Sequence, residues 1–169
     1  MAKYNNIING DLTNGDGLRV SLWFSGCEFH CKECHNQQLW DKNNGTDFDF
    51  STASDLLEML SDSHIDGLSI LGGEPLTDYN RKALYVYLPD VYEFLHKRGK
   101  DVWLWTGYTI DEIKQDDVLK DFLVHYVDRI ITGRYIDELR INGKYFGSSN
   151  QHMWTKEEFK EEIYGKRKS

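Results

Sequence analysis

Four short apolar segments alternate with amphipathic segments along the chain. Each apolar segment contains β-branched or aromatic residues and ends at a glycine, as buried strands commonly do before a turn. The segments cover residues 19–26, 67–73, 101–107 and 127–133. We therefore expect four strands, separated by stretches long enough to hold helices.

The stretches between and after these strands carry apolar residues at helical spacing. Helices are predicted over residues 51–60 and 79–98, around residues 118–123, and at the C-terminus over about 155–163. Pro89 should break or restart the second of these, because proline removes a backbone donor. Three predicted capping boxes mark helix starts: Thr52 with Asp55, Thr109 with Glu112 and Thr155 with Glu158.

This order of strand and helix predicts the fold class. Alternating βα units give an α/β protein with a mostly parallel sheet and outer helices. The length of 169 residues suits a single domain, 1–169, with its core at about residues 16–151. In such folds ligands bind at the carboxyl ends of the strands.

Three unusual stretches follow three of the predicted strands. "GCEFHCKECHN" follows the first, "GGEP" ends the second and "TGY" ends the third. Because parallel strands end at one edge of the sheet, we expect these stretches to meet there. The sequence thus predicts a binding site at that edge.

Composition narrows the class of partner. The formal net charge is −8, and "GKRKS" at the C-terminus is the one clearly basic stretch. We therefore expect no nucleic-acid partner, which would require a basic face. No apolar run reaches membrane-spanning length and the N-terminus lacks a signal-peptide core, so a cytoplasmic protein without a membrane partner is expected.

All the cysteines of the chain lie in one loop, as Cys27, Cys31 and Cys34 in a C-x₃-C-x₂-C arrangement. A disulfide framework fits poorly, because the count is odd and cytosolic thiols stay reduced. Zinc on the three thiolates and His35 is an alternative. A [4Fe–4S] cluster suits a single loop better, and three thiolates would leave one of its irons open to an outside ligand.

The glycine-rich turn adds a second potential binding element. Gly72 and Gly73 let the backbone approach a ligand closely, and Glu74 supplies an acceptor carboxylate. Pro75 stiffens the exit from the turn. The alternative is a plain strand-to-helix turn; the position opposite the cysteine loop favours a binding role.

At these residues the sequence resembles the radical S-adenosylmethionine (SAM) superfamily. "CEFHCKEC" matches its cysteine signature and "GGEP" its second motif. The resemblance implies a partial (β/α) barrel and a [4Fe–4S] cluster on Cys27, Cys31 and Cys34. It also implies that SAM chelates the open iron and is cleaved to a 5′-deoxyadenosyl radical.

A narrower resemblance covers about residues 16–151. "DGLRVSLWFSGC", "CHNQQLW", "LGGEPL", "WTGY", "DRIITGRY" and "FGSSNQ" together resemble the activating enzymes of anaerobic (class III) ribonucleoside-triphosphate reductase. This resemblance implies that the radical abstracts hydrogen from a glycine of the reductase large subunit, leaving a glycyl radical. A reduced one-electron donor such as flavodoxin is a further implied partner.

The resemblance also implies SAM contacts. Gly72, Gly73 and Glu74 would accept hydrogen bonds from the SAM amino group. Many superfamily members have an aromatic residue before the third cysteine, where this chain has Glu33. We therefore expect the backbone of Glu33, Cys34 and His35 to contact the adenine.

Some features leave other interpretations open. A small radical SAM enzyme acting on a metabolite and a zinc-binding interaction module are the rival functions. Arg19 and Arg134 could reach a carboxylate or a partner, although surface salt bridges are the commoner fate of arginines. Trp23, Trp40, Trp103 and Trp105 are expected in the core or lining a barrel.

Overall fold

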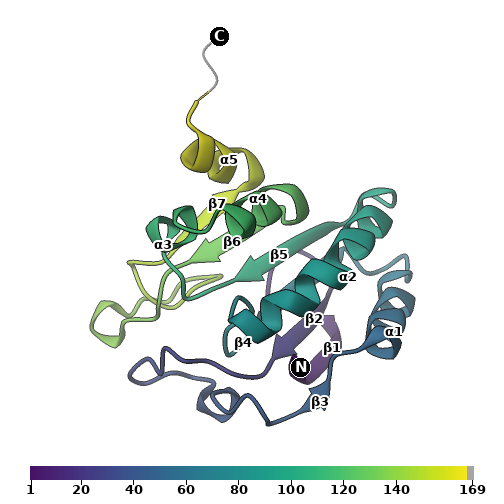
Figure 1. The fold of residues 1–169 in the computed structure, drawn as a ribbon. Helices are drawn as coiled ribbons and strands as arrows, with labels where there is room; N and C mark the ends of the chain where they lie inside the picture. Colours follow the sequence, from purple (N-terminus) through teal and green to yellow (C-terminus); the bar gives the residue numbers. More distant parts are fainter. Residues whose placement is uncertain (167–169) are drawn as a thin grey trace.

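The computed structural model describes residues 1–166, so the last three residues of the basic tail lie outside it. The chain folds into an α/β structure of one mixed sheet and flanking helices (Figure 1). The strands are β1 (Lys3–Asp11), β2 (Arg19–Phe24), β3 (Thr46–Asp47), β4 (Gly67–Gly72), β5 (Asp101–Trp105), β6 (Arg129–Thr132) and β7 (His152–Thr155). The helices are α1 (Phe50–Leu60), α2 (Asp78–His96), α3 (Ile110–Lys114), α4 (Asp117–Tyr126) and α5 (Lys156–Tyr164), with 3₁₀ turns η1 (Gln37–Leu39) and η2 (Asp137–Leu139).

The four predicted strands form the parallel centre of the sheet, whose order is β3-β1-β2-β4-β5-β6-β7. β2, β4, β5 and β6 pair in parallel, while β1 and β3 at one edge and β7 at the other pair antiparallel. The prediction of a mostly parallel sheet is therefore only partly correct, because the sheet is mixed. The edge strands escaped prediction because an exposed edge needs no apolar run, and β1 is largely polar and exposed.

The two faces of the parallel strands differ in chemistry. Every second residue of each strand, such as Leu22, Ile70 and Leu104, packs against the helices in one apolar core. The intervening positions face the other way and include Ser21, Ser69 and Trp103. Loop residues contact this second face: Ser69 donates to the backbone oxygen of Asn14, and the Tyr145 ring packs on Trp103. The same face continues into the cavity that Trp23 and Trp105 line.

The helices begin largely where the sequence predicts. The capping boxes at Thr109 and Thr155 are both present. The predicted box from Thr52 to Asp55 is wrong: α1 begins one turn earlier, at the N-cap Asp49, whose carboxylate accepts from the Thr52 N–H. Aspartate satisfies this donor as well as threonine does and adds a charge that favours the helix dipole.

Pro89 does not interrupt its helix. α2 runs unbroken from Asp78 to His96. The missing hydrogen bond and steric cost of an interior proline amount to about 3 kcal/mol. Burial of five aliphatic side chains along α2 outweighs this cost, at roughly 1.5–3 kcal/mol for each large one; they are Ala83, Leu84, Leu88, Val91 and Leu95. Within residues 1–166, no helix has the length and apolarity that crossing a bilayer requires.

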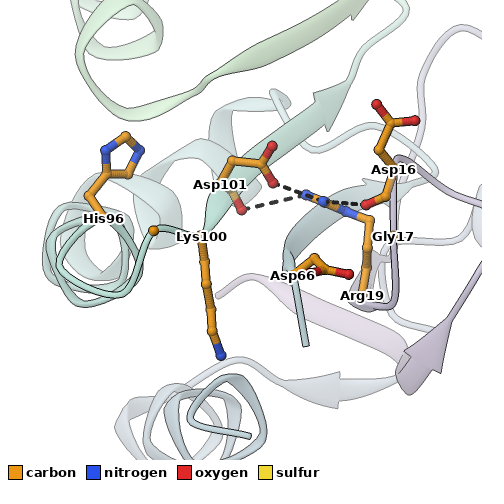
Figure 2. A pocket seen from close by; sticks show the side chains of 8 residues that line it. Asp16, Gly17, Arg19, Asp66, His96, Lys100 and Asp101 are labelled. Carbon is orange, nitrogen blue, oxygen red and sulfur yellow. Dashed lines mark hydrogen bonds and ion pairs between the residues drawn. The ribbon is translucent and has the colours of Figure 1, made fainter. Parts of the chain in front are cut away.

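A cavity of about 630 Å³ lies at the amino ends of the parallel strands. Arg19 projects there toward Asp101, as Figure 2 shows, with 2.8 Å between the guanidinium and the carboxylate. Arg19 is only 1 % exposed and also donates to Ser69 Oγ at 2.7 Å. Arg19 is therefore a buried cation whose partner Asp101 remains 41 % exposed, and its contacts join β2, β4 and β5. Its donors are used internally, so this cavity has a structural explanation.

Candidate functional site

A second cavity, of about 400 Å³, lies at the carboxyl ends of the parallel strands. In Figure 1 the arrowheads of β5 and β6 point toward this side, where the loops after β2 and β6 extend. The cavity brings together most of the site residues predicted from sequence: Cys27, Cys31, Cys34, His35, Gly72, Gly73 and Glu74. Glu33 lies outside its lining and is exposed.

The cysteine loop folds back on itself beside β2. Its three thiols are free and half-buried. Two non-glycine residues, His30 (φ 45°) and Glu33 (φ 59°), adopt left-handed backbone conformations, which turn the chain sharply between the cysteines. His30 stacks on Trp40 with ring centres 4.3 Å apart. His30 thus packs within the loop, as a side chain in a tight loop often does.

The thiols lie in a poorly solvated environment. Burial raises the pKa of Cys27 to about 11. Burial also raises the pKa of Cys31, and the backbone N–H of Tyr135 and the charge of Arg134 partly offset this rise. The thiols of Cys27 and Cys31 are therefore protonated at neutral pH until a metal displaces their protons, so metal loading releases protons.

The glycine turn lies against the start of the cysteine loop. Gly73 N donates to Phe24 O at 3.0 Å and Glu74 N to Gly26 O at 2.8 Å. A Cβ at Gly73 would lie 2.5 Å from Gly26 O and 2.7 Å from Leu39 O, closer than side-chain carbons approach backbone oxygens. Glycine is therefore required here by close approach of two backbone segments.

Glu74 is 1 % exposed, and protein donors surround its carboxylate. Thr106 Oγ1 donates at 2.7 Å and Gly107 N also at 2.7 Å, both from the end of β5. Leu76 N donates at 2.9 Å. Burial nevertheless raises the pKa of Glu74 to about 7, and these donors limit the rise. A cation bound in the cavity would favour the ionised form of this carboxylate.

The donor set fits a multi-iron cluster better than a single ion. Within residues 1–166, no three His, Cys, Asp or Glu side chains converge as ligands of one metal ion do. A cubane needs no such convergence, because each thiolate binds a different iron. A single zinc on Cys27, Cys31, Cys34 and His35 would require the loop to rearrange.

The "GSSNQ" stretch has a clear structural role that its sequence did not reveal. Gln151 Oε1 accepts from the N–H groups of Gly147 and Ser148, while its Nε2 donates to Gly133 O at 3.0 Å. Asn150 Nδ2 donates to Arg134 O at 2.8 Å. The stretch therefore fixes the turn after β6, which borders the cavity.

Sequence reasoning missed several residues that line the cavity. Tyr145 and Phe146 come from the loop before β7, and Trp105 Nε1 donates to Tyr145 O at 2.7 Å across the sheet face. Phe29 and Tyr135 also contribute. Phe29 lies within the cysteine signature and Tyr135 directly follows the "TGR" of residues 132–134, and these positions were the available signals. As expected, three of the four tryptophans considered, Trp23, Trp40 and Trp105, line the cavity, and Trp103 is buried beside them.

Comparisons with known proteins agree with this site. A family model described as a 4Fe-4S single cluster domain matches residues 13–154. An anaerobic ribonucleoside-triphosphate reductase-activating protein of Enterobacteria phage T4 is 38 % identical over 154 residues, 90 % of this chain and 93 % of the relative.

Cellular relatives carry the same name. The protein of Pasteurella multocida is 37 % identical, with 85 % of this chain and 91 % of the relative covered. That of Escherichia coli K12 is 31 % identical, with 83 % and 90 % covered. The resemblance read from the sequence motifs is confirmed. The chain belongs to the 4Fe-4S single cluster domain family and, within it, to the anaerobic ribonucleoside-triphosphate reductase-activating proteins.

Proposed function

We propose that this protein activates an anaerobic ribonucleoside-triphosphate reductase by forming a glycyl radical in the reductase large subunit. Its cofactors are a [4Fe–4S] cluster and SAM. When bound and reduced, the cluster supplies the electron that cleaves SAM, and the resulting 5′-deoxyadenosyl radical takes hydrogen from the reductase glycine. The observation that carries the proposal is the single cavity shared by the cysteine loop and the glycine turn.

Cys27, Cys31 and Cys34 are the proposed cluster ligands. They lie in one loop, are free thiols and border the same cavity. Because the chain has no fourth cysteine, one iron stays available to SAM. The N–H of Asn36 lies 3.4 Å from Cys34 Sγ, a donor that would stabilise the thiolate.

The glycine turn is the proposed site for the SAM amino group. An ammonium needs several acceptors, and the backbone carbonyls of Gly72 and Gly73 with the Glu74 carboxylate can supply them. Glu74 stays fixed by its three protein donors while it interacts with the cation. For adenine we propose the backbone of Glu33, Cys34 and His35, of which Cys34 and His35 line the cavity.

The wider expectations form part of the same proposal. The parallel strands with helices on one face are consistent with a partial (β/α) barrel of the radical SAM type, in a single domain. A reduced one-electron donor such as flavodoxin would supply the electron, in the cytoplasm. The net charge of −8 favours protein partners over nucleic acid.

Electron paramagnetic resonance (EPR) of anaerobically reconstituted protein tests this function. The reduced protein should give a [4Fe–4S]⁺ signal whose shape changes when SAM is added. A folded, iron-loaded sample whose EPR signal does not change when SAM is added would contradict the proposal. Metal analysis separates the zinc alternative, because iron with acid-labile sulfide and a single zinc are easily distinguished.

A further inference from the structure

In the sequence, Phe29 lies midway between Cys27 and Cys31. In the structure, side chains that follow two strand ends hold its ring. The guanidinium carbon of Arg134, after β6, lies 4.1 Å from the centre of the Phe29 ring. The ring of Tyr108, after β5, packs edge-on at 5.0 Å. A Cβ at Gly107 would lie 2.7 Å from Phe29, so the ring rests directly on the Gly107 backbone.

Arg134 is itself fixed from two sides. Its Nη2 lies 2.7 Å from Glu112 Oε1, in the first turn of α3. The other oxygen of Glu112 accepts from the Thr109 N–H at 2.9 Å and so caps that helix. The backbone oxygen of Arg134 accepts from Asn150. The guanidinium is thus oriented before any cofactor arrives.

Besides the contacts of Phe29, the segment of residues 28–33 is held by the stacking of the exposed His30 ring on Trp40 and by one ion pair. These residues belong to no helix or strand. The hydrogen bond between Lys32 and Glu138 is 3.2 Å long, and both side chains are more than half exposed. Such exposed ion pairs contribute little. The cation–π contact with Arg134 is worth more, because one face of the ring is shielded by Gly107.

Arg134 also brings a positive charge to the cavity lining. Among the described residues that line the cavity, it is the one lysine or arginine. Cys31 and Glu74 line the same cavity. Arg134 therefore places a positive charge in the cavity that the cysteine loop and the glycine turn share.

We propose that Arg134 is a positioning residue that acts through Phe29. By holding Phe29 against Gly107, it sets the separation between the cysteine loop and the glycine turn across which SAM must bind. This inference rests on the proposed function and assigns a role to two residues that are neither cluster ligands nor SAM contacts in that proposal.

The test compares Arg134→Met, which keeps length and loses charge, with Arg140→Met, an exposed arginine on the same loop. In anaerobically reconstituted full-length protein, the SAM concentration that half-converts the EPR signal should rise about tenfold for Arg134→Met and Phe29→Leu. Arg140→Met should stay within about twofold of wild type, the range expected of an exposed change. Arg134→Lys, which keeps the cation, should lose less SAM affinity than Arg134→Met.

The double variant distinguishes positioning from separate effects. If Arg134 acts through Phe29, Arg134→Met combined with Phe29→Leu should be no worse than the more severe single variant. Full additivity of the two losses would overturn the proposal. So would an Arg134→Met titration that matches that of Arg140→Met.

A second measurement needs no SAM. Amide hydrogen exchange of residues 28–33 should quicken roughly fivefold in Arg134→Met and remain unchanged in Arg140→Met, since loss of the cation–π contact frees the segment. Unchanged exchange in Arg134→Met overturns the inference. If wild type itself ignores SAM, the proposed function fails, while the exchange result still decides whether Arg134 holds this segment.

Discussion

Asn80 and Glu74 are joined by a buried hydrogen bond of 2.9 Å, from the Asn80 side-chain amide to the backbone oxygen of Glu74. The same amide donates at 2.9 Å to Ser25 O, at the end of β2. Asn80 is fully buried in the first turns of α2. One side chain thus connects the glycine turn to the strand that precedes the cysteines.

Asn80→Leu should destabilise the protein strongly. The substitution keeps a similar volume but removes the side-chain donor of Ser25 O and leaves Glu74 O with only the long 3.5 Å bond from Thr77 N. An unsatisfied buried group costs roughly 1–3 kcal/mol. Urea unfolding monitored by circular dichroism measures the loss, with Asn142→Leu as the exposed control. A loss no larger than that of the control would show that the Asn80 contacts are unimportant.

Gly73→Ala should separate the glycine turn from the cysteine loop. The new methyl group would meet two backbone oxygens, which cannot rotate away as a side chain can. We expect a loss of about 1–3 kcal/mol in unfolding free energy, the usual range for overpacking, together with weaker SAM binding by isothermal titration.

Gly99→Ala is the matched control for this substitution. A Cβ at Gly99 meets nothing within 4 Å, but its φ of +68° carries a backbone cost of roughly 1–2 kcal/mol. Gly99 is absent from the lining of the 400 Å³ cavity that holds the cysteine loop, so its variant should keep wild-type SAM affinity. Equal SAM affinities for the two variants would argue against the packing account of Gly73.

Glu74 should make stability depend on pH. Because burial raises the folded-state pKa of Glu74 from 4.5 to about 7, the folded state binds the proton more tightly than the unfolded state does. Below pH 4.5 both states are protonated and Glu74 carries no ionisation cost. As pH rises toward 7, this cost grows to about 3 kcal/mol and then remains constant.

Glu74→Gln removes this titration. Unfolding of cluster-free protein at several pH values should show the variant gaining about 3 kcal/mol relative to wild type between pH 4.5 and 8. The comparison concerns the change with pH, since the glutamine amide also places a donor near Gly107 N–H. Parallel stability curves would mean that Glu74 titrates at an ordinary pKa.

Cys31→Ser should prevent cluster assembly. A serine oxygen is a poor ligand for iron in such clusters, and two thiolates cannot hold the cube as three do. Iron and acid-labile sulfide analysis after anaerobic reconstitution provides the measurement. Melting by circular dichroism of the cluster-free forms controls for folding, and full cluster content in the variant would remove Cys31 from the ligand set.

The central fold was predictable because its signals are local. β4, for example, is a continuous apolar run bounded by glycines, and helix α3 begins at the capping box of Thr109. β1 and β7 could not be predicted in this way, because neither is a buried apolar run: β1 is largely polar and exposed, and the four residues of β7 are at most partly buried. Pro89 illustrates the same limit: burial of α2 against the sheet overrides a local signal.

The site was predictable to the extent that its chemistry lies in contiguous motifs. The cysteines and "GGEP" meet at one cavity because parallel strands end at one edge. Arg134 is different. Its contacts with Phe29 and Glu112 join residues far apart in sequence, and the sequence suggested only an ordinary surface salt bridge. The ion pair with Glu112 confirms that salt bridge. The prediction did not include the contact with the Phe29 ring.

The most direct test of the account is the formation of a glycyl radical. The reconstituted protein would be mixed anaerobically with an anaerobic ribonucleoside-triphosphate reductase, SAM and a reductant, and examined by EPR. The account predicts a doublet from the reductase glycine that requires all four components. A cluster-loaded protein that cleaves SAM yet never yields this doublet would contradict the proposed activation.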